Sequence, residues 1–329
     1  MQFKKALHIF LVLLFGFLTA SAQDDDIIKV DYSIVRLNVG VVDGRGRPIT
    51  SLTKENFTVY EDGVKQDIAR FEPTVAPFSA VLILDMSGST LGFRQTIQQS
   101  ALRFIDALAP DDRVAVIEFY DKVNLRNDFT TNRRIIVNSI GAANGRGKTQ
   151  LYKAIDFALG KLGKEGKRRK AIIVLTDGID TSLQNTDRDF LAKFKENEIL
   201  NAIKPETNDA LNQILNKSDA QGVTVYPLAL PTGDPRKLAE PTPIQIAMFS
   251  AARSRLQILA DRTGGTLNTI NRLEDMGRLY AAVAADMRAL YTVEYQPVNT
   301  KRDGKWRAIK IEVNNPELIS KTRQGYFAK

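Results

Sequence analysis

The chain has 329 residues, a length that suits about two domains, and its formal net charge of +8 is modest for that length. It has no cysteine, and its one histidine, His8, lies near the start. Disulfides, zinc sites built from His and Cys, and Ser-His-Asp or Cys-His catalysis are therefore excluded for the rest of the chain.

Residues 1–22 have the pattern of a secretory signal peptide. Lys4 and Lys5 precede an apolar run over residues 6–18, and Ala20-Ser21-Ala22 forms a cleavage site. The run is shorter than the roughly 20 apolar residues that span a bilayer, although a retained anchor is the alternative. No later stretch is long and apolar enough to span one. We therefore expect an exported protein, periplasmic or secreted, with no transmembrane segment after cleavage.

Residues 28–75 are expected to be rich in β-structure. Val30–Val42 alternates between apolar and polar positions, and a turn cluster rich in Gly and Pro follows it. Phe57–Tyr60 is a predicted strand, and Ile68–Phe71 is expected to return after a hairpin turn at Asp62-Gly63.

From residue 77 to 290 the pattern changes to alternating strands and helices, which is typical of a parallel sheet. The apolar runs predict strands at 79–84, 113–119, 170–176, 222–230 and 266–270, with an edge hairpin at 123–129. The helical spacings predict helices at 90–108, 133–140, 151–162, 187–201, 205–220, 250–262 and 273–289. The predicted fold class is α/β, with a doubly wound, mostly parallel, Rossmann-like sheet.

Residues 291–329 return to β-structure, with strands expected at 291–295, 306–313 and 323–327. Neither this segment nor residues 28–75 has enough strands to form a core of its own. We therefore expect the two segments to pack together as one small β-sandwich, with the α/β domain inserted between them.

Three oxygen-bearing side chains follow the first strand of the α/β domain at alternate positions: Asp85, Ser87 and Ser89. Ligands of open α/β sheets bind just beyond the carboxyl ends of the strands, which is where these residues fall. Oxygen donors without His or Cys suit Mg²⁺, Mn²⁺ or Ca²⁺. The alternative is that the three residues only cap the following helix.

Two later residues complete a recognisable set. Thr149 precedes a predicted helix, and Asp177 ends a second apolar strand. The order Asp-x-Ser-x-Ser, then Thr, then Asp resembles the metal-ion-dependent adhesion site of the von Willebrand factor A (VWA) domain family, over roughly residues 77–290. The resemblance implies metal ligation by these five residues. It also implies a protein partner whose Asp or Glu carboxylate takes an open position on the cation.

The segment ahead of this domain also resembles a known pattern. Gly46-Arg47-Pro48, Leu52-Thr53 and the run from Phe57 to Gly63 are similar to the β-sandwich preface of some exported bacterial A-domain proteins. The resemblance implies an exported binding protein. The alternative is a structural or assembly subunit of a cell-envelope complex, with a degenerate or non-essential metal site.

Other candidate sites have weaker support. Asp111, Asp112, Asp121 and Asp180 lie near predicted strand ends, and we interpret them as loop or cap residues that leave no defined glycosidase pair. Thr181 and Ser182 are possible rim residues. A metal-assisted hydrolase needs a base beyond the metal, and none is visible, so we expect no enzyme.

The stretch 141–149 looks like a phosphate loop but has five residues where the motif needs four, so we expect no nucleotide. The basic run 164–170 has no interleaved aromatic residues and predicts a solvated loop, with attraction to an acidic surface as the alternative. We expect no nucleic acid.

Overall fold

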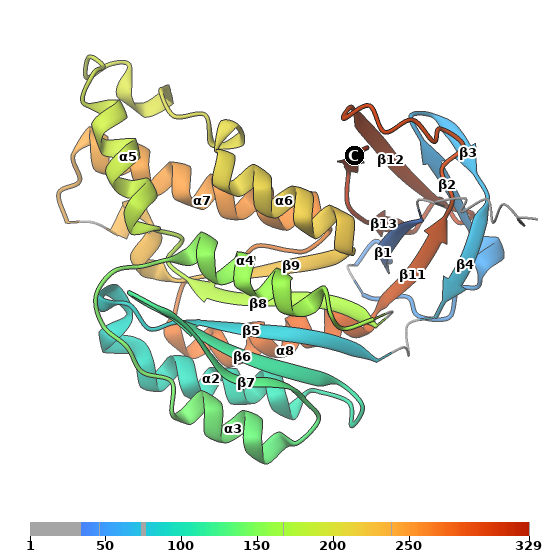
Figure 1. Cartoon of the computed structure of the whole chain (residues 1–329), viewed down its shortest axis with the longest axis horizontal. Helices are drawn as coiled ribbons and strands as arrows, with labels where there is room; N and C mark the ends of the chain where they lie inside the picture. Colours follow the sequence, from blue (N-terminus) through green and yellow to red (C-terminus); the bar gives the residue numbers. More distant parts are fainter. Residues whose placement is uncertain (1–33, 46, 74–76, 167, 238, 329) are drawn as a thin grey trace, which may run out of the picture. The chain divides into compact units, whose positions relative to one another are not determined.

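A computed structural model describes residues 34–45, 47–73, 77–166, 168–237 and 239–328. The predicted signal peptide, residues 1–22, lies outside them. In the described residues no helix is both long enough and apolar enough to span a membrane. Figure 1 shows an α/β part and a β-rich part, and both ends of the described chain contribute to the β-rich part.

The α/β part contains a six-stranded sheet with the order β10-β9-β8-β5-β6-β7. Its strands are β5 (Phe78–Asp85), β6 (Arg113–Phe119), β7 (Val123–Thr130), β8 (Arg169–Thr176), β9 (Val223–Ala229) and β10 (Asn268–Thr269). All neighbours are parallel except β7, which pairs antiparallel with β6 at the edge. This is the doubly wound, mostly parallel sheet that the sequence predicts.

Helices cover both faces of this sheet (Figure 1). They are α2 (Arg94–Asp106), α3 (Arg133–Gly141), α4 (Leu151–Leu162), α5 (Thr181–Leu191), α6 (Asp209–Gln221), α7 (Pro243–Thr263) and α8 (Met276–Arg288). Buried side chains of α2, α3 and α8 form one apolar cluster against the sheet, and those of α4, α6 and α7 form another on its other face. Because both faces are covered, β5 and β8 are buried along their whole length.

Several helix boundaries differ from those predicted. The helix expected from residue 187 begins six residues earlier, because the side chain of Asp180 accepts hydrogen bonds from the backbone N–H groups of Ser182 and Leu183. It ends at Leu191, well short of the expected residue 201. The helix expected from residue 250 begins at Pro243, where Thr242 and Gln245 form a capping box. The first turn expected for α2 is instead a 3-10 helix, Gly88–Phe93. In α5 and α7, the capping residues determine where the helix begins, and the apolar spacing alone did not predict these positions.

The β-rich part consists of two four-stranded sheets, β13-β1-β11-β4 and β14-β12-β2-β3. The strands of the N-terminal segment are β1 (Val35–Val42), β2 (Phe57–Glu61), β3 (Val64–Gln66) and β4 (Ile68–Glu72). Those of the C-terminal segment are β11 (Leu290–Tyr295), β12 (Trp306–Val313), β13 (Ile319–Lys321) and β14 (Gly325–Phe327). Both sheets mix strands from the two segments, and one apolar cluster fills the space between them.

Two details of this sandwich differ from the prediction. The hairpin at Asp62-Gly63 joins β2 to β3, whereas β4 pairs with β11 in the other sheet. The strand β13 was not expected. It has only three residues and no apolar pattern of its own, and it is placed by its pairing with β1.

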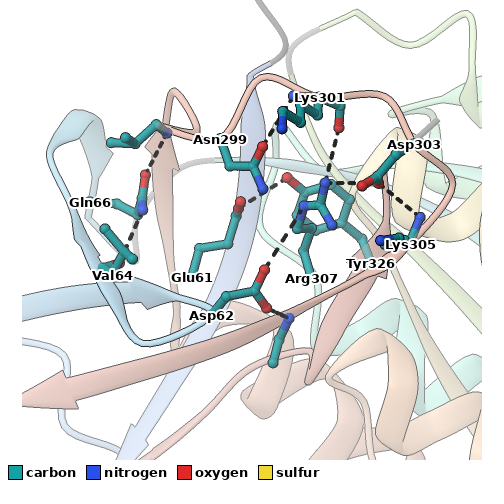
Figure 2. A network of polar contacts seen from close by, with 12 residues as sticks. Glu61, Asp62, Val64, Gln66, Asn299, Lys301, Asp303, Lys305, Arg307 and Tyr326 are labelled. Carbon is teal, nitrogen blue, oxygen red and sulfur yellow. Dashed lines mark hydrogen bonds and ion pairs between the residues drawn. The ribbon is translucent and has the colours of Figure 1, made fainter.

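Buried polar groups of the sandwich find partners within it (Figure 2). The Arg307 guanidinium donates to Asp303 Oδ1 at 2.9 Å and to the Lys301 carbonyl at 3.0 Å, and it lies 3.9 Å from Asp62. The Glu61 carboxylate accepts hydrogen bonds from the hydroxyls of Tyr295 and Tyr326, at 2.7 and 3.0 Å. The Arg307 contacts hold the loop before β12 near the hairpin of β2 and β3, and the Glu61 contacts join β2 to β11 and β14.

The basic run at residues 164–170 is not simply a solvated loop. Arg169 and Lys170 are buried at the start of β8. The Arg169 guanidinium donates to the carbonyls of Met287 and Leu290, at the end of α8 and the start of β11. A cation is favourable at a helix C-terminus, where carbonyl groups are left without partners. This part of the run therefore joins the sheet to the α8–β11 connection.

Candidate metal site

The candidate site lies beyond the carboxyl ends of β5 and β8, which are neighbours in the sheet. Asp85 is the last residue of β5, and Asp177 directly follows β8. Residues 80–84 of β5 and 171–175 of β8 are all apolar and buried, so the two strands run side by side to the sheet edge, where the carboxylates that follow these apolar runs lie close together. The two carboxylates are nearly buried, with Asp85 fully inaccessible and Asp177 5% exposed.

A hydrogen-bond network joins four of the five predicted residues. The Ser89 hydroxyl donates to Asp177 Oδ2 at 2.7 Å, and the hydroxyls of Ser87 and Ser89 are 3.2 Å apart. Asp85 Oδ1 accepts from the Ser87 backbone N–H at 3.0 Å. The structure therefore brings Asp85, Ser87, Ser89 and Asp177 together at one edge of the sheet.

Thr149 reaches the same edge through its backbone. Its N–H donates to the Thr181 hydroxyl at 2.9 Å, and its carbonyl accepts from the Thr181 N–H at 3.0 Å. Thr181 follows Asp177 by four residues. This pair of hydrogen bonds therefore holds Thr149 beside the loop that carries Asp177. The sequence placed Thr181 at the rim without a role, and the structure gives it this one.

The loop of Thr149 also touches the loop of the two serines. The N–H of Gly88, between Ser87 and Ser89, donates to the carbonyl of Gly147 at 3.0 Å. Gly147 has a φ of +102°, and a Cβ there would lie 2.3 Å from an Asp121 carboxylate oxygen. Glycine is therefore needed at this contact. Residue spacing gave no sign of it.

Burial and like charge make the two carboxylates unfavourable as a pair. Burial raises the pKa of Asp85 most, and the negative charge of Asp177 raises it further, to about 7. Burial also raises the pKa of Asp177, although hydrogen bonds from Ser89 and Ile179 lower it. The Thr176 hydroxyl donates to Asp85 Oδ2 at 2.9 Å, a contact that the sequence did not predict. The partners of both carboxylates are thus hydroxyl and N–H groups.

The donor set fits a hard divalent cation. Two carboxylates and three hydroxyls are oxygen ligands, and a cation between the carboxylates offsets their repulsion. The described residues contain no cluster of three or more His, Cys, Asp and Glu side chains suited to a metal. The candidate set differs from such a cluster because most of its donors are neutral hydroxyls.

The other predicted carboxylates have structural contacts. Asp180 is the N-cap of α5, as expected, and Asp112 accepts from the backbone N–H groups of Phe78 and Ala109. Asp121 Oδ1 accepts from the Lys148 N–H at 2.6 Å. Asp111 contributes its carbonyl to Arg168. The interpretation of Asp112, Asp121 and Asp180 as loop or cap residues is confirmed.

The stretch that looked like a phosphate loop does not have the required context. A phosphate loop connects a strand to a helix. Here residues 142–150 connect α3 to α4, and Gly147 contacts the serine loop instead.

Comparison with known proteins agrees with this geometry. A family model described as the von Willebrand factor type A domain matches residues 80–179. The chain contains a von Willebrand factor type A domain. All five candidate site residues, from Asp85 to Asp177, lie within the matched stretch.

Three further proteins are similar to this chain. The uncharacterized protein sll0103 of Synechocystis is 32% identical over 106 residues, or 31% of this chain and only a quarter of that relative. A solved von Willebrand factor type A protein from Catenulispora acidiphila is 14% identical, covering 92% of this chain and 64% of its own, with a TM-score of 0.48. The von Willebrand factor domain of the type V pili tip protein Mfa5 from Porphyromonas gingivalis is 14% identical, covering 64% and 95%, with a TM-score of 0.47.

Proposed function

We propose that this chain binds a protein partner through a divalent cation, Mg²⁺, Mn²⁺ or Ca²⁺, held at the edge of its A domain. Asp85, Ser87, Ser89, Thr149 and Asp177 would hold the cation. The bound cation supplies an electrophilic position for an Asp or Glu carboxylate of the partner. The observation that carries the proposal is that two buried carboxylates meet hydroxyl donors at this edge. Within the described residues, no basic group is among their hydrogen-bond partners.

The chain's own residues support binding rather than catalysis. Asp121 and Asp180, two further carboxylates in loops beside the site, both accept hydrogen bonds from backbone N–H groups. The chain has no cysteine, and its single histidine lies in the predicted leader. We therefore propose a binding protein without enzymatic activity, which the leader directs to the periplasm or the medium.

Thermal unfolding with EDTA, and then with each cation, tests the metal site. A cation that binds only the folded state raises the unfolding midpoint. In Asp85→Asn we expect this rise to disappear, while the midpoint in EDTA increases because one of two buried like charges is gone. Asp156→Asn is the matched control, since Asp156 is an exposed carboxylate on α4, and it should keep the full cation response.

The partner side of the proposal has its own test. Capture of a carboxylate-bearing partner should require the cation and should be lost in Asp85→Asn. Capture that persists in EDTA would instead favour the assembly subunit, in which the metal site is not used for binding.

A further inference from the structure

Two exposed basic residues flank the glycine that touches the serine loop. Arg146 and Lys148 lie on either side of Gly147, whose carbonyl accepts from Gly88 at 3.0 Å. Gly88 itself lies between the two serines of the candidate site, and Lys148 directly precedes Thr149. Both cations are therefore within one residue of the contact that joins the two halves of the site.

A third exposed cation belongs to the turn between β6 and β7. Lys122 follows Asp121, and Asp121 holds this turn against the Thr149 loop. Its Oδ1 accepts from the Lys148 N–H at 2.6 Å, and its carbonyl accepts from the Gln150 side chain at 2.7 Å. Among the described residues, no carboxylate forms an ion pair with the side chains of Lys122, Arg146 or Lys148.

Beneath these residues a fourth cation is fixed by neutral acceptors. The Arg94 guanidinium donates to Asn144 Oδ1 at 2.5 Å, to the Met86 carbonyl at 3.0 Å and to the Gly145 carbonyl. It ties the serine loop to the Thr149 loop and leaves its own charge without a carboxylate. Against these four cations, the serine loop, the Thr149 loop and the turn between β6 and β7 offer one exposed carboxylate, Asp121, so this side of the site is positive.

The opposite side of the site differs. There the loop between β9 and α7 carries Arg236, whose guanidinium donates to both carboxylate oxygens of Asp234, at 3.0 and 2.8 Å. This pair neutralises itself. Lys122, Arg146 and Lys148, by contrast, form no such ion pair within the described residues, so their charge at residues 120–122 and 144–148 is available to an acidic partner.

We infer that the partner presents an acidic segment and not a single acidic residue. This inference rests on the proposed function: one carboxylate takes the cation, and further Asp or Glu side chains beside it pair with Arg146, Lys148 and Lys122. Each exposed pair is worth a few-fold in affinity at most, because water and salt screen it. Several together raise the affinity about tenfold and increase the association rate.

The test uses two fluorescent peptides of equal length with Gly and Ser flanks, one with a single Glu and one with three neighbouring acidic residues. Binding to the full chain is measured by anisotropy at 50 and 300 mM salt, with Mg²⁺ and with EDTA. We expect the triacidic peptide to bind about tenfold more tightly in Mg²⁺ at low salt. In R146Q/K148Q this ratio should fall to about two, whereas the control K65Q/K164Q, which removes two distant exposed charges, should keep it.

The outcomes separate the two proposals. Mg²⁺-dependent binding of both peptides with equal affinity overturns the acidic-segment inference and leaves the metal-dependent function standing. Binding of neither peptide in Mg²⁺ overturns the proposed function, and the inference with it. Equally tight binding of the triacidic peptide and of heparin in EDTA would show a metal-independent polyanion surface, which also overturns both.

Discussion

The sandwich and the metal-site edge of the A domain both bury carboxylates, but they compensate the charge differently. In the sandwich Glu294 is buried against the Arg36 guanidinium of the neighbouring strand. At the site Asp85 and Asp177 have only hydroxyl and N–H partners. A buried charge that is compensated inside the chain serves the fold, whereas one left without an opposite charge points to a ligand.

The largest expected effect comes from breaking a compensated charge. Arg36→Ala leaves Glu294, 7% exposed, without its cation, and we expect a loss of about 3 kcal/mol in the free energy of unfolding. Urea denaturation of the full chain, followed by circular dichroism, measures this loss. The double variant Arg36→Met with Glu294→Leu should recover most of it, and the cation response should be unchanged in both. A loss below about 0.5 kcal/mol in the single variant would contradict the comparison.

The next effect is the pH dependence of the uncompensated pair. The pKa of Asp85 is about 7 in the folded chain against 3.8 for an ordinary Asp, so its contribution to stability is complete below pH 4 and is lost as the pH rises through 7. In EDTA we expect the free energy of unfolding to fall by about 2 kcal/mol between pH 5 and pH 8. Added Mg²⁺ should restore it at pH 8, and Asp85→Asn should have a flatter profile. Parallel profiles for the variant and the natural chain would refute this cause.

A smaller effect is expected where the loop after β9 packs on the site. A Cβ at Gly233 would lie 1.9 Å from the carbonyl oxygen of Asp177, so Gly233→Ala must displace one of the two backbones. We expect a loss of about 1–3 kcal/mol in stability and roughly tenfold in cation affinity, measured by calorimetric titration with Mn²⁺. Gly160→Ala is the control, because a Cβ there meets nothing within 4 Å in α4, and it should not lower either quantity.

The smallest effect concerns the contact that orders Thr149. Thr181→Ala removes the hydroxyl that accepts from the Thr149 N–H, and Thr181→Ser keeps it. We expect a loss of about 1 kcal/mol in stability and a few-fold lower Mn²⁺ affinity in the alanine variant only. If the serine variant lost affinity equally, packing of the methyl group would explain the effect and not the hydrogen bond.

The sequence predicted which side chains of the candidate site lie close together wherever a short pattern carried that information. Asp85, Ser87 and Ser89 stand at alternate positions after an apolar strand, and Asp177 ends another, so the sheet edge alone brings them together. The contact of Gly88 with Gly147 lies outside that reach, because it depends on how two loops meet. The hydrogen bond from the Thr176 hydroxyl to Asp85 could not be predicted from a short pattern either, because Thr176 and Asp85 belong to different strands.

The fold, too, was predicted well where local sequence determines the structure and less well where a residue distant in the sequence does. Of the strands with clear alternation, β12 covers the predicted residues 306–313, and β1 ends at the predicted Val42. Arg169 looked solvated because its partners, Met287 and Leu290, lie more than a hundred residues away. The exchange of β4 into the sheet of β11 is likewise set by a partner that no local pattern names.

The connection between the A domain and the sandwich has a mechanical consequence. β4 ends just before β5, β11 follows α8, and the two are antiparallel neighbours with Glu72 opposite Thr292. A partner that pulls on the A domain therefore loads both strands from the same end, and they carry the tension side by side. The shear falls on the seam between β11 and β1, from Val35 opposite Tyr295 to Gly40 opposite Leu290. Hydrogen bonds perpendicular to the strands share such a load along the whole seam instead of opening one after another.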